Sequence, residues 1–263
     1  MKTICVFNQK GGVGKTTTNI NLATYLAFEG KKVLIVDIDP QGNSTSGLGI
    51  DKSNLEFSTY DILTNDTNIE ECIIKSELIE NLYVIPSEQA LAGAEVELTG
   101  INHREDILKR KLELVRDKFD FVFIDCPPSL GLLTINALVA SDSVFIPIQC
   151  EYYALEGVSQ LINTINLVKK SLNPDIKYEG ILLTMYDTRA NLCNEVAKEV
   201  KNHFGDYVYK TVIPRNVRLS ESPSYGMPIT EYDPRSKGAK SYTKFAREFL
   251  KLNEEEKKDN HMM

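Results

Sequence analysis

A glycine-rich stretch that contains two lysines lies near the start of the chain. Residues 10–17 read Lys-Gly-Gly-Val-Gly-Lys-Thr-Thr, and they follow a short apolar run and open a helical pattern. The three glycines have no Cβ, so the backbone can turn sharply and its N–H groups can approach an anion. Lys15 can then reach the β- and γ-phosphates of a nucleotide, and the Thr16 hydroxyl can hold Mg²⁺. The alternative is an ordinary glycine-rich turn between a strand and a helix.

Three aspartates follow apolar runs, where a metal ion or an attacking water would need them. Asp37 and Asp39 are two residues apart, so both side chains fall on one side of a strand end, and Pro40 favours an extended exit of the chain. Asp125 ends a buried apolar run, and a buried acid needs a partner, for which Mg²⁺ bound through water is suited. The alternatives are solvated turn acids for the pair and a helix-capping acid for Asp125.

Short apolar runs alternate with helical patterns along the chain, and the chemical groups follow the runs. Most runs are nearly continuous, which indicates strands buried on both faces. The alternation predicts an α/β fold with a mostly parallel, twisted sheet and helices on both faces. In such sheets ligands bind at the carboxyl ends of the strands. The predicted strands are 4–7, 33–36, 82–85, 121–124, 144–148, 180–183 and 212–213, and the predicted helices are 15–29, 104–118, 131–140, 154–172, 192–204 and 239–252.

No repeat, linker or low-complexity block divides the 263 residues, so one domain is expected over 1–253, with a disordered tail at 254–263. The first residues do not read as a signal peptide and no run of 18 apolar residues occurs, which favours a cytoplasmic protein. The cysteines have no metal-binding spacing and are expected to be reduced thiols in or near the core. They are Cys5, Cys72, Cys126, Cys150 and Cys193.

The charge is unevenly distributed along the chain. The formal net charge of −7 argues by itself against a nucleic-acid-binding protein. Residues 185–250, however, contain 11 Lys/Arg and 8 Asp/Glu, so this segment is basic while the rest of the chain is acidic. A basic surface in this segment therefore stays open as a site for a polyanion.

The glycine-rich stretch departs from the usual phosphate-loop pattern, which would need glycine where Gln9 stands. The string Lys-Gly-Gly-x-Gly-Lys-[Ser/Thr] instead resembles the deviant Walker A motif of the ParA/MinD ATPases, and the chain is identified as a P-loop NTPase of that type. The resemblance implies that residues Lys10, Gly11, Gly12, Val13, Gly14, Lys15, Thr16 and Thr17 bind the nucleotide. It makes Lys10 the signature lysine, which crosses a dimer interface to the ATP of the partner and offsets charge on the transferring phosphoryl group.

The same resemblance assigns roles beyond the phosphate loop. The residue matching Asp39 positions or activates the attacking water, so the implied catalytic residues are Lys10, Lys15 and Asp39. Thr16, Asp37 and Asp125 are the implied Mg²⁺ residues. Pro214 and Asn216 match the segment that holds adenine in the Soj branch, where proline offers an apolar surface and asparagine paired donors and acceptors. From the residues alone, that segment is equally well an ordinary loop.

Several further strings are similar to the Soj/ParA segregation ATPases rather than to MinD, and the resemblance covers almost the whole chain. They are the strings at 39–49, 125–131, 149–157 and 232–238. The short N-terminus lacks the helix-turn-helix extension of larger plasmid-type relatives, so sequence-specific operator binding is not expected.

Three function classes compete on this basis. A MinD-like, membrane-associated positioning ATPase needs a basic amphipathic C-terminal helix; 239–252 carries an apolar stripe, but the acids at 254–256 follow it and an anionic membrane would repel them. That stripe is therefore expected to dock on the core of the protein. A reductase-type relative needs cysteines that hold an iron–sulfur cluster between subunits, and Cys126 has no suitable companion.

The third class, a DNA-partitioning ATPase, is the one we expect. Arg189 and Arg218 match arginines that contact DNA in Soj-like proteins, although each is equally well a solvated surface charge. Further candidates for the same patch are Lys198, Lys201, Lys237, Lys240 and Arg247. The implied cycle has an ATP-dependent homodimer that binds DNA non-specifically, a ParB-type partner that stimulates slow intrinsic hydrolysis, and ADP-bound dimers that separate. The expected location is the cytoplasm, on the nucleoid, with no membrane association.

Overall fold

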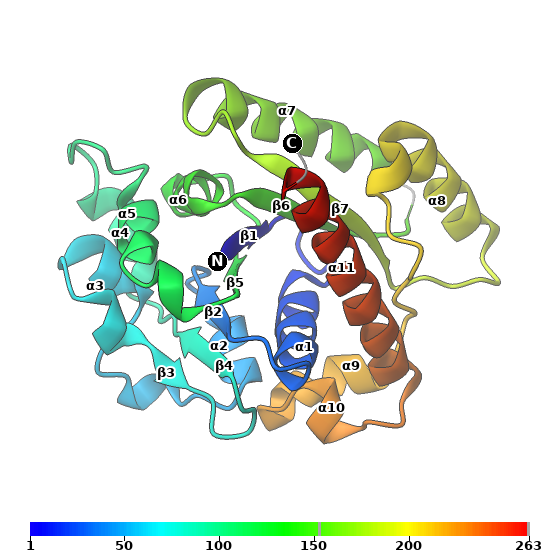
Figure 1. Ribbon diagram of the computed structural model, residues 1–263, viewed down its shortest axis with the longest axis horizontal. Coiled ribbons are helices and arrows are strands. Elements are labelled where there is room, and N and C mark those ends of the chain that lie inside the picture. Colours follow the sequence, from blue (N-terminus) through cyan, green and yellow to red (C-terminus); the bar gives the residue numbers. More distant parts are fainter. Residues whose placement is uncertain (152–153, 262–263) are drawn as a thin grey trace.

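The fold is a seven-stranded sheet covered by helices on both faces (Figure 1), seen here in a computed structural model that describes residues 1–151 and 154–261. The strand order is β3-β4-β2-β5-β1-β6-β7, and every pairing is parallel except β3 with β4. The strands are β1 (Lys2–Val6), β2 (Val33–Asp37), β3 (Ile74–Lys75), β4 (Leu82–Ile85), β5 (Phe121–Asp125), β6 (Ser143–Gln149) and β7 (Lys177–Thr184). The predicted α/β class with a mostly parallel sheet is confirmed. Tyr152 and Tyr153, part of the string at 149–157, lie outside the described residues.

Helices connect the strands and then close the chain. They are α1 (Lys15–Phe28), α2 (Asn43–Gly47), α3 (Thr59–Thr64), α4 (Leu91–Glu97), α5 (Ile107–Glu113), α6 (Leu132–Ala140), α7 (Ala154–Ser171), α8 (Asn191–Phe204), α9 (Val217–Glu221), α10 (Ile229–Tyr232) and α11 (Lys237–His261). Short 3₁₀ turns lie between several of them. The predicted helix 104–118 is divided into α5 and a separate 3₁₀ turn at Arg116–Lys118. The short helices α2, α3, α4, α9 and α10 were not predicted, because each is too brief to show a hydrophobic period.

Alternate side chains of the central strands pack into two separate hydrophobic cores, one on each face of the sheet. In β1, Ile4 and Val6 face the core beneath α1 and α11, whereas Cys5 faces the core beneath α3 to α8. Figure 1 shows α1 and α11 together on one side of the strands, with α6 and α7 on the other. Both strand faces are therefore buried, which explains the nearly continuous apolar runs in the sequence.

The apolar stripe of α11 is buried in the protein itself. Tyr242, Phe245, Ala246 and Phe249 are at most 2% exposed and pack among the phenylalanines of β5 and β6. The Tyr242 hydroxyl also lies 2.9 Å from that of Thr18 in α1, so the helix is tied to the helix that follows the glycine-rich loop. The expectation that this stripe docks on the core matches the structure.

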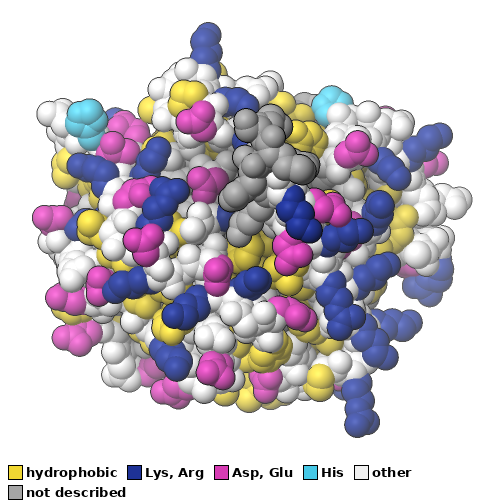
Figure 2. Space-filling model, viewed as in Figure 1, with side chains coloured by type: hydrophobic (Ala, Val, Ile, Leu, Met, Phe, Trp, Pro, Cys, Tyr) yellow, Lys and Arg dark blue, Asp and Glu magenta, His cyan; other side chains and the backbone are white. Residues whose placement is uncertain are grey.

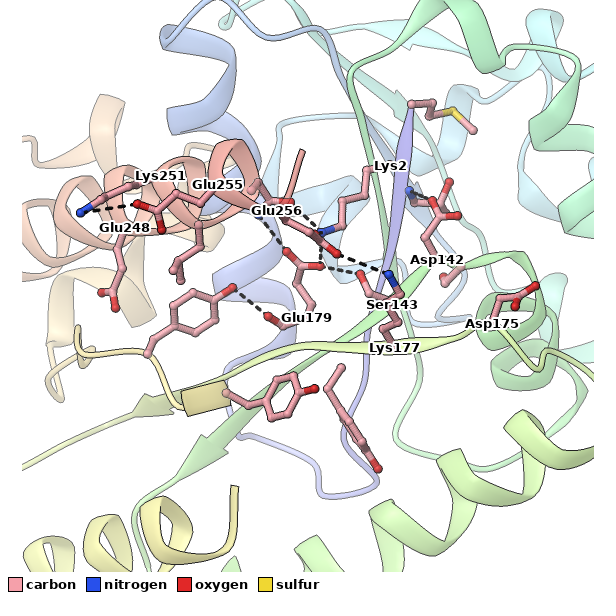
Figure 3. A pocket seen from close by; sticks show the side chains of 18 of the residues that line it. Lys2, Asp142, Ser143, Asp175, Lys177, Glu179, Glu248, Lys251, Glu255 and Glu256 are labelled. Atoms are coloured by element: carbon pink, nitrogen blue, oxygen red, sulfur yellow. Dashed lines mark hydrogen bonds and ion pairs between the residues drawn. The ribbon is translucent and has the colours of Figure 1, made fainter. Parts of the chain in front are cut away.

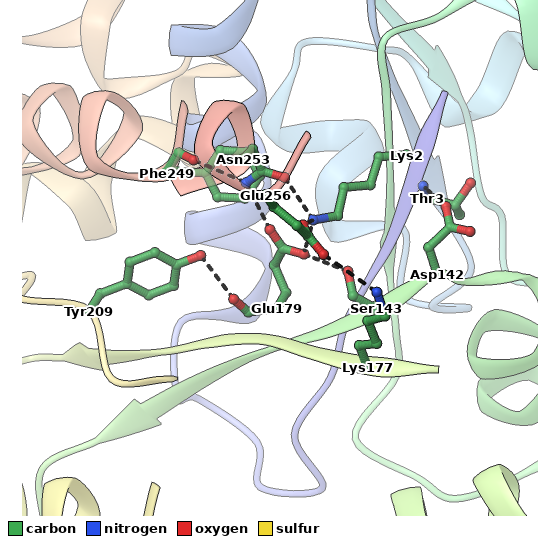
Figure 4. Close-up of polar contacts among 10 residues, drawn as sticks. All are labelled: Lys2, Thr3, Asp142, Ser143, Lys177, Glu179, Tyr209, Phe249, Asn253 and Glu256. Atoms are coloured by element: carbon green, nitrogen blue, oxygen red, sulfur yellow. Dashed lines mark hydrogen bonds and ion pairs between the residues drawn. The ribbon is translucent and has the colours of Figure 1, made fainter. Parts of the chain in front are cut away.

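The C-terminal end of α11 lies at the amino ends of the strands, opposite the ends that carry the glycine-rich loop. Lys2 forms ion pairs with Glu179 (2.7 Å) and Glu256 (2.8 Å) and donates to Asn253 Oδ1 (2.7 Å), as Figures 3 and 4 show. Burial disfavours the charged form of Lys2, but the two carboxylates outweigh it and raise its pKa. These residues line a cavity of about 1290 Å³ at the amino ends of β1, β6 and β7.

Two expectations about elements differ from the structure. Helix α11 continues to His261, whereas a disordered tail was expected from residue 254; the contacts of Glu256 with Lys2 and Lys177 hold this end against the sheet. Residues 212–213 do not form a strand. The Ile213 N–H donates to the Leu183 carbonyl of β7 (2.9 Å), and the next residue forms an isolated bridge between Tyr186 and Pro214.

Candidate nucleotide-binding site

The glycine-rich loop joins β1 to α1 and exposes backbone N–H groups at the start of the helix. Gly12 and Gly14 have φ values of 75° and 89°, the left-handed region that residues with a Cβ rarely adopt. Gly14 precedes α1, and no side chain caps the helix, so its first N–H groups remain available to an anion. The Val13 carbonyl accepts a hydrogen bond from Thr184 Oγ1 (2.8 Å), which anchors the loop to the end of β7.

Lys15 is the first residue of α1 and folds back over the loop. Its Nζ donates to the Lys10 carbonyl oxygen at 3.2 Å, and the residue is 8% exposed. Burial lowers the pKa of Lys15, although the charge of Asp125 opposes this shift. A cation that is desolvated and bound to a single neutral carbonyl is well suited to exchange that contact for phosphate oxygens.

Lys10 lies at the start of the same loop, and its side chain contacts the segment that follows β6. Its ammonium forms an ion pair with Glu151, which follows β6. The Lys10 N–H donates to Asn8 Oδ1 at 3.0 Å, so the backbone at this position is also fixed. The side chain is thus engaged within its own subunit.

Asp37 and Asp125 stand side by side at the carboxyl ends of β2 and β5, where they are register partners. Both are fully buried. Burial, and then the charge of Asp125, raises the pKa of Asp37. Burial also raises the pKa of Asp125, and the nearby hydroxyls of Ser44 and Thr16 oppose that shift. Two adjacent buried carboxyls create a site that a divalent cation would stabilise.

The two carboxyls differ in how well their hydrogen bonds leave them free to bind Mg²⁺. Asp125 Oδ2 accepts from Ser44 Oγ at 2.7 Å, whereas its Oδ1 is buried without a partner among the described residues. This orphaned oxygen, with Thr16 beside it, fits a Mg²⁺ ion held directly or through water. Asp37 instead accepts from Thr45 at Oδ2 and from the Asp39 N–H at Oδ1, so its part in the Mg²⁺ site stays a prediction.

Asp39 lies in the turn after β2 and is 8% exposed. Its Oδ1 accepts from the Gln41 N–H (2.9 Å), and its charge acts on both Lys15 and Asp125. The carboxylate therefore lies within the electrostatic reach of the phosphate loop, as the sequence predicts.

Pro214 and Asn216 line a small pocket of about 120 Å³ beside the loop. Its other walls include Gly14, Thr17 and Tyr242. Asn216 Oδ1 accepts from the Leu219 N–H (3.3 Å) and so caps α9, which leaves its amide group for another contact. The structure thus brings this distant segment to the same edge as the phosphate loop.

Arg189 and Arg218 lie on the surface rather than in this site. Their side chains are 88% and 54% exposed, and they pair with Asp187 (3.0 Å) and Glu221 (2.9 Å) respectively. Figure 2 shows that Lys and Arg side chains also gather along α11 and toward α8. Exposed cations of α11 include Lys237, Lys240, Lys244, Arg247 and Lys251, whose three- and four-residue spacing places them on one helical face.

Sequence reasoning missed several residues that surround the site. Ser44 and Thr45 could have been suspected, because the string Gly-Asn-Ser-Thr resembles the start of a helix. Ser87 gave no signal, and Glu151 lies in the string at 149–157 but had no role assigned, since each residue reaches the site from a distant segment. All five cysteines are buried and free, and Cys126 lies 3.3 Å from Cys5 rather than at a surface where a cluster could bind. In the part of the chain that the structure describes, no group of three or more His, Cys, Asp or Glu could hold a metal.

Known proteins resemble this chain along nearly its whole length. An AAA domain family model matches residues 1–178. The sporulation initiation inhibitor protein Soj of Bacillus subtilis is 62% identical over 94% of this chain and 97% of its own length. The chromosome partitioning protein ParA of Myxococcus xanthus is 55% identical over 95% of this chain and 88% of its own.

Among solved structures, a cobyrinic acid a,c-diamide synthase of Mycobacterium smegmatis with bound ADP and magnesium is 38% identical. Its TM-score is 0.82, and the match covers 94% of this chain and 93% of that one. With the glycine-rich loop, the paired carboxyls and the sheet order already described, these identities settle the relationship: the chain belongs to the Soj/ParA family of chromosome-partitioning ATPases and has their P-loop α/β fold.

Proposed function

We propose that this chain is a DNA-partitioning ATPase that binds MgATP, hydrolyses it slowly by itself and uses the nucleotide state to control dimerisation and DNA binding. The observation that carries the proposal is the arrangement at one sheet edge of Lys15, the uncapped start of α1 and the orphaned Asp125 oxygen. A phosphate chain with its divalent cation would satisfy all three groups at once.

Each part of ATP has a matching group in this arrangement. The N–H groups of 11–17 and the Lys15 ammonium bind phosphate oxygens, and Thr16 with Asp125 holds Mg²⁺. Bound Mg²⁺ would neutralise charge on the phosphates and orient them. Pro214 and Asn216 hold the base in the pocket beside Gly14. Asp39 orients the attacking water.

Lys10 completes the site only when two subunits meet. Its side chain pairs with Glu151 while Lys15 folds over the loop, which supports a role for Lys10 toward the nucleotide of a second copy rather than its own. A site that is finished by a partner hydrolyses ATP slowly when alone, which is consistent with stimulation by a ParB-type protein.

The cations on α11, together with Arg189 and Arg218, support non-specific binding to DNA phosphates and hence association with the nucleoid. Such binding depends on salt and not on sequence. The membrane alternative is not favoured, because the apolar stripe that it would require is at most 2% exposed and packs on the sheet. No helix of the described residues has the length and apolar character needed to cross a bilayer.

Co-sedimentation of the full chain with DNA, in ATP, in ADP and without nucleotide, tests this proposal. Parallel samples contain anionic liposomes in place of DNA. We expect DNA binding in ATP alone and no liposome binding. Liposome binding in ATP without DNA binding would favour the membrane class, and equal DNA binding in all three nucleotide states would refute nucleotide control.

A further inference from the structure

Four residues from three segments form a closed ring of hydrogen bonds behind Asp39. The Asp39 N–H donates to Asp37 Oδ1 (3.2 Å), and Thr45 Oγ1 donates to Asp37 Oδ2 (2.8 Å). The Ser87 N–H donates to Thr45 Oγ1 (2.9 Å), and Ser87 Oγ donates to the Asp39 carbonyl (2.7 Å). The ring thus connects the turn after β2, the helix α2 and the segment after β4.

The direction of three of the four bonds in this ring is fixed by chemistry. An amide N–H can only donate, so Thr45 Oγ1 must accept from Ser87, and toward an ionised Asp37 its own hydroxyl donates. A carbonyl oxygen can only accept, so the Ser87 hydroxyl must donate to Asp39. The two bonds made by Ser87 therefore cannot reverse.

The ring is also shielded from water. Asp37, Thr45 and Ser87 are 0% exposed, and Asp39 is 8% exposed. Gly42 approaches the same segment so closely that a Cβ there would lie 2.8 Å from the Ser87 carbonyl oxygen. Water cannot replace a lost partner in this packing, so removal of the Thr45 hydroxyl leaves the buried Ser87 N–H without its acceptor. The Asp39 carbonyl, in contrast, also accepts from the Gly42 N–H (2.8 Å) and keeps that bond without Ser87.

We propose that Thr45 and Ser87 are positioning residues for ATP hydrolysis, which hold the Asp39 backbone from both sides. The Asp39 N–H is fixed through Asp37 and Thr45, and its carbonyl through Ser87 together with the Gly42 N–H, so that the carboxylate keeps one orientation toward the phosphate loop. The inference rests on the proposed role of Asp39 in orienting the attacking water. A group with that task must stay within a fraction of an ångström of its productive position.

The first experiment separates turnover from binding in the full chain. Thr45→Val removes the hydroxyl at nearly constant volume, and Thr45→Ser retains it; Ser87→Ala removes the other hydroxyl. We expect Thr45→Val to lower kcat by about 10- to 100-fold, as loss of supporting contacts around reactive groups does, with KM and the calorimetric Kd for ATP nearly unchanged. Thr45→Ser should restore most of kcat, and Ser87→Ala should show a smaller loss.

Thr64→Val is the matched control. The Thr64 hydroxyl also donates to a carbonyl oxygen in a partly buried place (Tyr60, 2.8 Å), but Thr64 lies in α3, outside the ring. We expect wild-type kcat in this variant. A purely structural role for Thr45 would lower thermal stability in Thr45→Val and leave kcat at the wild-type value, which would overturn the inference.

A second readout needs no nucleotide. Amide hydrogen exchange of Ser87 in the nucleotide-free protein should be faster in Thr45→Val than in wild type, because its acceptor is gone, and unchanged in Thr64→Val. Equal Ser87 exchange in Thr45→Val and wild type would show that the ring does not form in solution.

A double-mutant cycle with Asp39→Asn distinguishes this inference from the proposed role of Asp39. If Thr45 acts through Asp39, the double variant Thr45→Val/Asp39→Asn has the kcat of Asp39→Asn alone. Independent, multiplicative losses would overturn the positioning role while the role of Asp39 stands. Wild-type kcat in Asp39→Asn, in contrast, would refute the role of Asp39 itself.

Discussion

Lys10 and Glu151 form an ion pair within a single subunit, between the start of the phosphate loop and the end of β6. Both side chains are about one-third exposed, at 38% and 33%, so the pair can exchange with another partner at little cost. The lysine that is expected to cross to a second subunit is therefore engaged within its own subunit in this structure.

Lys10→Ala should leave ATP binding intact and prevent ATP-dependent dimerisation and hydrolysis, because Lys10 serves the nucleotide of the other subunit. Glu151→Gln, which frees Lys10 without removing it, should dimerise at least as readily as wild type. Light scattering with ATP, together with phosphate release, measures both. A Lys10→Ala protein that dimerises and turns over normally would refute the role of the signature lysine.

Lys15→Ala should weaken ATP binding by roughly 100-fold or more, since contacts to a charged group are worth about 1.5–3 kcal/mol each. The fold should persist, because a desolvated cation with one neutral partner adds little to stability. Calorimetry gives the affinity and thermal unfolding the stability. Equal ATP affinity in variant and wild type would contradict the assignment.

Asp39→Ala should reduce hydrolysis by about 10²- to 10⁴-fold, the usual contribution of a positioned acid–base group. The phosphate loop is unchanged, so ATP should still bind and the dimer should persist. Such a protein should remain on DNA longer than wild type after ATP is diluted. Turnover at the wild-type rate would mean that Asp39 is only a turn residue.

Arg189→Glu and Arg218→Glu should each weaken DNA binding in ATP without a change in ATP affinity. Each lost phosphate contact should also flatten the log–log salt dependence by about one unit. Lys75→Glu, on β3 at the opposite edge of the sheet, changes the net charge equally and should bind as wild type. Gel shifts at several salt concentrations decide this. If both arginine variants bind normally, Lys240→Glu and Lys244→Glu on α11 test whether that face binds DNA instead.

Glu179→Ala should destabilise the protein by about 3 kcal/mol, because it leaves Lys2 charged and largely buried without its nearest carboxylate. The double variant Lys2→Met/Glu179→Leu should cost less, since both charges are removed together. Glu70→Ala breaks an exposed pair with Lys118, half-exposed on both sides, and should change stability by no more than about 0.5 kcal/mol. Denaturant unfolding measures all three. A Glu179→Ala protein as stable as wild type would show that the ion pair between Lys2 and Glu179 does not stabilise the fold.

The sequence by itself determined the local chemistry of this protein. The spacing of Gly12, Gly14 and Lys15 fixes a loop that opens a helix, because left-handed backbone and an uncapped helix start are local properties. The buried strands also follow from local apolar runs. The short strand β3 and the helices α2 and α9 do not follow from the sequence. Segments this short show no hydrophobic periodicity, and the packing around them determines their secondary structure.

Only the tertiary structure decided which distant groups meet. Ser87 is 48 residues from Asp39 and Glu151 follows a different strand from Lys10, yet both contacts form because parallel strands bring their carboxyl ends to one edge. The structure likewise gave Asp37 hydrogen-bond donors at both oxygens, while one Asp125 oxygen has no partner among the described residues. Asp37 and Asp125 both end buried strands in the sequence, but they differ in the fold. A buried carboxyl depends on the hydrogen-bond donors that the surrounding segments supply, and only the tertiary structure sets those donors.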